Sequence, residues 1–187
     1  MTIEIHPATG ERWPDFEQLL GPKKGGSGGC WCMLWRLKKR DYDDLGKDGR
    51  RSAIANRFQQ DLPFGLLAYD GKQPIGWCSI APRAEFPRLE TSRILAAVDN
   101  EPVWSITCFY IAKAYRRRGI SVRLLERAAD FVREHGGSVI EGYPIEPDRA
   151  NYPAVYAWIG LANAFRAAGF SEVARRSPTR PIMRKCL

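Results

Sequence analysis

Three consecutive arginines directly before a glycine are the clearest chemical feature of the sequence. Arg116, Arg117 and Arg118 precede Gly119, and apolar residues at helical spacing begin at Ile120. The first turn of a helix presents backbone N–H groups without intrahelical partners and a partial positive charge, and a glycine lets an anion approach closely. The pattern therefore predicts a phosphate-binding loop. A run of solvated surface charges is the alternative, but placement between a strand and a helix favours the phosphate site.

The loop differs from both common nucleotide-binding motifs. The chain lacks the Gly-x-x-x-x-Gly-Lys-Ser/Thr pattern and the three spaced glycines of dinucleotide-binding loops. Nucleoside triphosphates and nicotinamide cofactors are therefore poor candidates for the bound anion.

Two strands and a helix must hold this loop in place. Residues 103–111 (VWSITCFYI) are β-branched and aromatic, as in a central strand. Apolar residues on one face indicate a helix over 119–135, which a Gly-Gly pair ends, and residues 138–143 read as a second strand. Strand, loop, helix and strand together have the layout of a βαβ crossover.

Patterning along the rest of the chain predicts further strands and helices. We expect strands at 2–6, 66–69, 75–80, 172–176 and 182–186, and helices at 11–20, 48–60, 94–98 and 155–168. Asp70 and Gly71 favour a tight hairpin turn, because glycine supplies the positive φ angle that the reversal needs. The glycine-rich stretch 21–29 is expected to form a flexible loop, and the aromatic segment 30–36 to lie in the core with part of it lining a substrate pocket.

The arginine loop resembles motif A of the GNAT superfamily of acyl-CoA-dependent N-acetyltransferases, whose Arg/Gln-x-x-Gly-x-Gly/Ala loop holds the pyrophosphate of coenzyme A. Arg116, Gly119 and Ser121 occupy the three defining positions. Ser121 departs from the usual Gly or Ala, although it is small and its hydroxyl can cap the helix. The order of elements from Ile3 to Cys186 also follows the superfamily layout.

The resemblance implies one α+β domain over residues 1–187, with a three-layer α/β arrangement. Its central mixed, mostly antiparallel sheet of about seven strands would be flanked by helices and splayed at the central parallel pair of strands. Residues 103–143 would bind the cofactor, and residues 21–60 would form a variable acceptor-side region.

The resemblance further implies an enzyme of the EC 2.3.1 type that uses acetyl-CoA as co-substrate and needs no metal. The pantetheine arm would pair with backbone groups near Phe109 and Ile111. An amine would attack the thioester directly while backbone N–H groups stabilise the oxyanion. The expected cofactor-binding residues are Phe109, Ile111, Arg116, Arg117, Arg118, Gly119, Ile120 and Ser121, together with Asn163 unless it lies on a plain helix surface.

The usual general base and acid are both replaced. Superfamily members often carry a Glu on the central strand, where this chain has Ser105 and Thr107. Glu141 is the substitute candidate, and alternation places it on one strand face with Tyr143. A structural Glu paired with an Arg of a neighbouring element is the equally weighted alternative.

The position of the usual acid, a Tyr four residues before Gly169, holds Phe165, which cannot donate a proton. Tyr156 is therefore the candidate acid. A solvated thiolate, Tyr110 and Tyr143 stay open, as does a packing role for Tyr156. A protein that binds coenzyme A without catalysis is the corresponding alternative function.

Composition adds further expectations about partners. The 187 residues carry 29 Lys plus Arg against 21 Asp plus Glu, a net charge of +8, which suggests a polyanionic partner. No nucleic-acid recognition motif accompanies the charge, so we expect a small-molecule or peptide amine as acceptor and neither nucleic acid nor membrane as partner; a homodimer stays open.

The first residues lack the basic segment and the long apolar segment of a secretory signal, which favours a cytoplasmic protein. Five cysteines without framework spacing favour reduced thiols, and Cys30-x-Cys32 lacks the further ligands of a zinc site.

Overall fold

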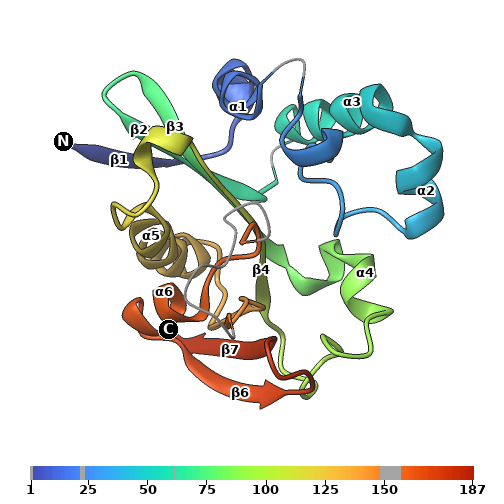
Figure 1. Cartoon of the computed structure of the whole chain (residues 1–187), viewed down its shortest axis with the longest axis vertical. Helices are drawn as coiled ribbons and strands as arrows, with labels where there is room; N and C mark the ends of the chain where they lie inside the picture. Colours follow the sequence, from blue (N-terminus) through green and yellow to red (C-terminus); the bar gives the residue numbers. More distant parts are fainter. Residues whose placement is uncertain (1, 22–23, 61, 148–156) are drawn as a thin grey trace.

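A seven-stranded sheet forms the centre of the protein, seen here in a computed structural model that describes residues 2–21, 24–60, 62–147 and 157–187. The strands follow the spatial order β1-β2-β3-β4-β5-β7-β6 (Figure 1). They are β1 (Ile3–Pro7), β2 (Gly65–Asp70), β3 (Gln73–Pro82), β4 (Trp104–Ile111), β5 (Val139–Gly142), β6 (Ser171–Arg175) and β7 (Pro181–Cys186). Only the β4–β5 pairing in this sheet is parallel. The predicted mixed, mostly antiparallel sheet is confirmed.

Helices cover both faces of the sheet (Figure 1). The α-helices are α1 (Trp13–Leu20), α2 (Lys39–Asp44), α3 (Gly46–Phe58), α4 (Pro87–Glu90), α5 (Ile120–Glu134) and α6 (Ala162–Ala167), and short 3₁₀ turns are η1 (Gly10–Arg12), η2 (Ser27–Gly29), η3 (Arg83–Glu85) and η4 (Lys113–Tyr115). One apolar core joins α5 and α6 to the sheet, and a second joins α1 and α3 to its opposite face. Helix, sheet and helix make the three layers that the sequence predicted.

The β4 strand contains the irregularity that shapes the centre of the sheet. Ser79 of β3 pairs with Cys108 and Ile80 pairs with Ile106, so Thr107 is an extra residue in a β-bulge. β4 pairs with β5 only over Trp104–Ile106, although β4 continues to Ile111. The two parallel strands therefore diverge beyond the bulge, which is the expected splay.

Two predicted helices differ from the structure. Residues 94–98 are not helical; the short helix of that connection is α4, where Pro87 fits the first turn. The helix expected over 155–168 is limited to α6 in the described residues, because Gly160 has a φ of +89° and Leu161 is extended. Leu161 instead forms a parallel bridge with Ile145.

Candidate active site

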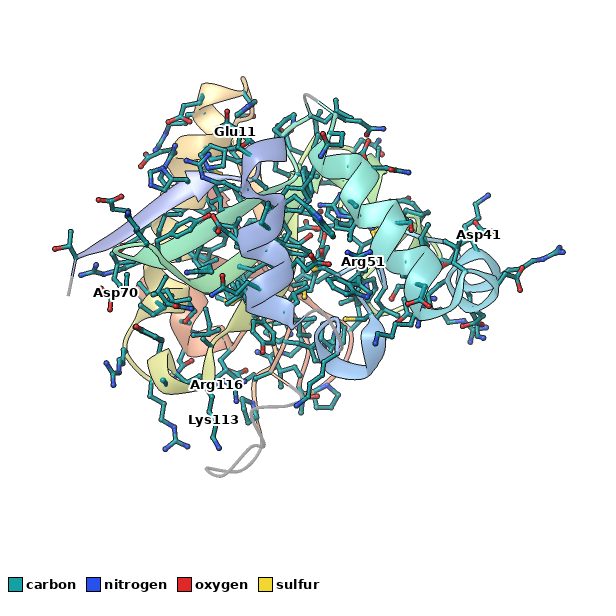
Figure 2. All side chains as sticks on the ribbon, turned by 90° about the horizontal axis from the view of Figure 1, so that it is seen from above. Glu11, Asp41, Arg51, Asp70, Lys113 and Arg116 are labelled. Atoms are coloured by element: carbon teal, nitrogen blue, oxygen red, sulfur yellow. The ribbon has the colours of Figure 1, made fainter. Side chains whose placement is uncertain are left out.

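The arginine loop places Gly119 at the N-cap of α5. Gly119 has a φ of +76°, and a Cβ at this position would meet no atom within 4 Å. The preceding residues Arg116, Arg117 and Arg118 are exposed, and Figure 2 shows Arg116 on the same side of the molecule as Lys113. The start of α5 thus combines N–H groups that no side chain caps with three exposed cations just before it, which suits a phosphate.

The first turn of α5 differs from expectation in one respect. Ser121 is the second residue of the helix, and no side chain in the described residues caps this terminus. The expected Ser121 cap is therefore not formed, which leaves the N–H groups for another acceptor. Ile120 buries its side chain in the core and anchors the turn to the sheet.

The edge of β4 beyond the splay is already hydrogen-bonded. The Phe109 N–H donates to the carbonyl of Trp158 at 2.5 Å, and the carbonyl of Ile111 accepts from Arg116 Nε at 3.0 Å. Backbone groups predicted to meet the pantetheine arm thus have partners within the chain. A carbonyl acceptor already lies where the resemblance places the thioester.

Phe165 fills the space below the splay as a core residue. Its ring is fully buried and lies 6.0 Å from the Phe109 ring, edge to face. A Cβ on Gly142 or Gly160 would come within 2.1 Å and 2.7 Å of this ring, so both glycines are needed for close packing. The usual acid position is therefore a hydrophobic wedge. Asn163, on the same helix, is exposed.

Glu141 is fully buried and held by three donors. Arg83 Nη1 lies 3.2 Å from its carboxylate, Arg184 Nε lies at 2.7 Å, and the Tyr143 hydroxyl donates at 2.7 Å. Alternation does place Glu141 and Tyr143 together, as predicted. The ion pairs with Arg83 and Arg184 match the structural alternative for this residue. Tyr156, the other candidate catalytic residue, lies outside the described residues.

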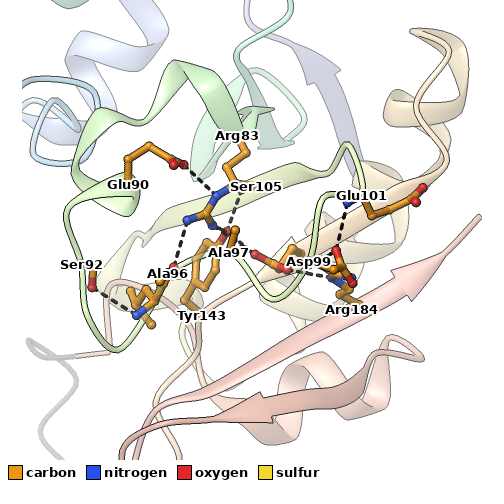
Figure 3. A network of polar contacts seen from close by, with 12 residues as sticks. Arg83, Glu90, Ser92, Ala96, Ala97, Asp99, Glu101, Ser105, Tyr143 and Arg184 are labelled. Atoms are coloured by element: carbon orange, nitrogen blue, oxygen red, sulfur yellow. Dashed lines mark hydrogen bonds and ion pairs between the residues drawn. The ribbon is translucent and has the colours of Figure 1, made fainter.

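The network around Glu141 reaches from the sheet to the connection before β4 (Figure 3). Arg83 also donates to the Tyr143 oxygen at 2.7 Å, and Ser105 lies 2.8 Å from the same oxygen. Burial and the Glu141 charge raise the pKa of Tyr143 well above its usual range, so Tyr143 keeps its proton at neutral pH.

The network also includes an ion pair before β4. Arg184 donates two hydrogen bonds of 2.6 and 2.9 Å to Asp99 and lowers the pKa of that carboxyl.

A second polar cluster lies on the sheet face opposite α5 and was missed in the sequence. Arg36 is only 5% exposed and donates to the Phe64 carbonyl at 2.7 Å and to Ser79 Oγ at 3.1 Å. Thr107 of the β4 bulge donates to the same Ser79 oxygen at 3.3 Å. Buried arginines are rare. Arg36 ends the aromatic segment that was expected in the core, but nothing in the sequence indicated its hydrogen-bond partners Phe64 and Ser79.

Cys32 belongs to this cluster and adopts a φ of +60°, which is unusual for a residue other than glycine. The Trp77 N–H donates to its sulfur at 3.0 Å. Burial alone would raise the pKa of Cys32, but hydrogen bonds from Cys108 and Trp77 and the Arg36 charge together lower it. The cysteines are free, and within the described residues no group of three or more His, Cys, Asp or Glu side chains could hold a metal ion.

The splayed mixed sheet and the arginine loop at the N-terminus of α5 define an acyl-CoA-dependent transferase fold. The sequence profile of the acetyltransferase (GNAT) family matches residues 31–158, so the chain belongs to this family. Among the described residues, no helix is long and apolar enough to span a membrane.

Solved structures share the fold at low sequence identity. PaiA N-acetyltransferase of Thermoplasma acidophilum, solved in complex with coenzyme A, is 14% identical over 100% of both chains, with a TM-score of 0.55. YncA of Salmonella typhimurium, solved with acetyl-CoA, is 15% identical over 100% of this chain and 94% of its own, with a TM-score of 0.55. Aminoglycoside 6'-N-acetyltransferase AAC(6')-Ih of Acinetobacter baumannii is 19% identical over 94% and 95% of the two chains, with a TM-score of 0.53. No curated protein matches the sequence.

Proposed function

We propose that the protein is an N-acetyltransferase that moves the acetyl group of acetyl-CoA to an amine of a small molecule or peptide. The observation that carries the proposal is the open N-terminus of α5 at Gly119, behind three exposed arginines and beside the splay of β4. Family membership and neighbours solved with coenzyme A or acetyl-CoA support it.

The residues of the loop suit the pyrophosphate of the co-substrate. N–H groups of the α5 first turn and the Arg116, Arg117 and Arg118 guanidiniums would share its charge. Acetyl-CoA would supply an activated thioester, so the protein mainly has to position the two reactants.

Phe109 is the proposed oxyanion donor. Its N–H already donates to a carbonyl oxygen, that of Trp158, and is therefore oriented for the same kind of acceptor. We infer that Trp158 withdraws and the thioester carbonyl takes its place. The hydrogen bond from the Phe109 N–H then strengthens as negative charge develops on that oxygen.

Glu141 is proposed as a positioning residue rather than the proton acceptor. Both carboxylate oxygens are engaged by Arg83, Arg184 and Tyr143. The network fixes Tyr143 and Ser105 directly beside the point where β4 and β5 separate. The acceptor would then attack as a free amine that has lost its proton to solvent. As the amide C–N bond forms, the thioester C–S bond would break, and coenzyme A would leave as a thiolate that takes a proton from solvent or from the attacking amine.

The test is an assay of coenzyme A release with acetyl-CoA and a panel of amines, with mass spectrometry of the acceptor. The proposal predicts amine-dependent release and an acceptor heavier by one acetyl group. A reaction without acceptor gives the background hydrolysis. Acetyl-CoA binding without acetylation of any amine would instead identify a non-catalytic coenzyme A binder, the alternative that Phe165 and the paired Glu141 favour.

A further inference from the structure

A pocket on the acceptor side of the sheet carries positive charge. It has a volume of about 410 Å³ and is lined by Trp35, Lys38, Lys39, Pro87, Arg88 and Thr91. This volume suits a small molecule. Lys39 is paired with Asp43 at 2.7 Å, and no carboxylate lines the pocket in the described residues. The remaining cations, Lys38 and Arg88, give the pocket a net positive character.

Two buried donors of the pocket lack acceptors within the described part of the chain. They are Trp35 Nε1 and Arg88 Nη2. Arg88 is otherwise held in place, because its Nε donates to the Leu37 carbonyl at 3.1 Å and its guanidinium lies 5.0 Å from the Tyr42 ring. A buried N–H without an acceptor is costly, so both donors would gain from an oxyanion that reaches them from the pocket.

A third cation adds to the local positive potential. The Arg36 guanidinium lies 4.5 Å from the ring of Phe86, the residue before Pro87 in the pocket wall. Its Nε and Nη1 also lack acceptors among the described residues. The nearby Glu85 carboxylate is bonded to Arg57 instead. Burial, and after it the Arg57 charge, lowers the pKa of Arg36 to about 9.

The pocket is connected to the proposed reaction centre through Trp158. The Trp35 ring lies 6.2 Å from the Trp158 ring, and the Trp158 carbonyl accepts the Phe109 N–H at 2.5 Å. An acceptor molecule in the pocket would therefore lie two residue contacts, through Trp35 and Trp158, from the proposed reaction centre. One ligand could bind by its acid group in the pocket and present its amine near Phe109.

We propose that the acceptor is an amine that also carries a carboxylate, such as an amino acid, and that Arg88 and Trp35 bind this carboxylate. The inference rests on the proposed N-acetyltransferase function and names its substrate class. A carboxylate supplies two acceptor oxygens, one for each unpartnered donor.

The experiment compares acids with their carboxamides at three spacer lengths: glycine, β-alanine and γ-aminobutyrate, each beside its amide. We expect wild type to prefer the acid, in kcat/KM, for at least one spacer. Arg88→Gln and Trp35→Phe should each reduce the ratio of acid to amide kcat/KM, by about tenfold for Arg88→Gln. Because each ratio is compared between variants, the different amine pKa values of acid and amide cancel.

Arg93→Gln is the matched control, since Arg93 is exposed and does not line the pocket; it should leave the ratio unchanged. Two outcomes would overturn the inference while the N-acetyltransferase function stands. One is an equal loss of kcat/KM for acids and amides in Arg88→Gln. The other is acetylation of amides and other amines by wild type without any preference for acids. If no amine reacts, calorimetry with γ-aminobutyrate and glycine decides: binding weakened by Arg88→Gln supports the pocket, and no binding refutes it. Failure of acetyl-CoA itself to bind would contradict the proposed function separately.

Discussion

The backbone N–H of Phe109 and the carbonyl of Trp158 are joined by a hydrogen bond of 2.5 Å. This bond connects the diverging part of β4 to the segment that leads into α6, and the Trp158 ring also contacts the Trp35 side of the charged pocket. Trp158 therefore contacts one residue of each proposed substrate site. Its position should respond to acetyl-CoA before the acceptor arrives.

Tryptophan fluorescence should report this movement. Acetyl-CoA is expected to shift the emission of wild type, because Trp158 withdraws from Phe109 and changes its environment. Trp158→Phe should lose most of the shift. Trp104→Phe serves as control, since Trp104 is buried against Phe131 and should retain the response. An identical shift in Trp158→Phe would show that this residue stays in place.

Replacing Glu141 by Gln should lower the free energy of unfolding by about 3–5 kcal/mol, because two arginines lose the charge that compensates them in a buried site. Urea unfolding measures the change. Glu90→Gln is the matched control: Glu90 pairs with the same Arg83 at 2.9 Å but its side chain is 58% exposed, so its loss should cost within about 1 kcal/mol. Similar stabilities for the two variants would contradict a structural role for Glu141.

The dependence of rate on pH should follow the acceptor rather than the protein. Glu141 is held by ion pairs, and Tyr143 keeps its proton because its pKa is raised by burial and by Glu141. With two acceptors of different amine pKa, log kcat/KM should rise with pH up to the pKa of each amine. If log kcat/KM stopped rising at the same pH for both acceptors, that pH would report a base on the protein and would count against direct attack by the free amine.

The variant Phe165→Tyr tests whether a tyrosine at the usual general-acid position would take part in catalysis. The ring is fully buried and packs closely against Gly142 and Gly160, so the variant, with its added hydroxyl, should overpack this site and lose about 1–3 kcal/mol of stability. Its kcat, corrected for the folded fraction, should not rise above that of wild type. A gain in kcat with unchanged stability would show that the usual acid chemistry can be restored at this position.

Local chemistry made the sheet and the start of α5 predictable. Gly71 and Gly119 both have positive φ angles, and each marks a feature that the sequence located: the hairpin turn and the start of α5. The apolar face of α5 has helical spacing over fifteen residues, which few other structures could explain.

Features set by distant contacts were not predictable. The helix expected over 155–168 is limited to α6 in the described residues, because Gly160 packs against Phe165 and Leu161 pairs with Ile145. Arg36 is buried by residues from three other parts of the chain, including Phe64, Ser79 and Phe86. The Glu141 ion pairs depend on Arg83 and Arg184, which lie 58 and 43 positions away in sequence. Sequence spacing identifies neither partner.

Calorimetric titration with acetyl-CoA tests the central claim most directly, with two glycines at the ends of α5 as a matched pair. Gly119 and Gly136 have φ angles of +76° and +75°, and at neither would a Cβ meet an atom within 4 Å, so valine imposes similar backbone strain at both. We predict that wild type and Gly136→Val bind acetyl-CoA, and that Gly119→Val binds at least about tenfold more weakly, a loss of about 1.4 kcal/mol. No binding by wild type, or equal binding by Gly119→Val, would contradict the assignment of the co-substrate site.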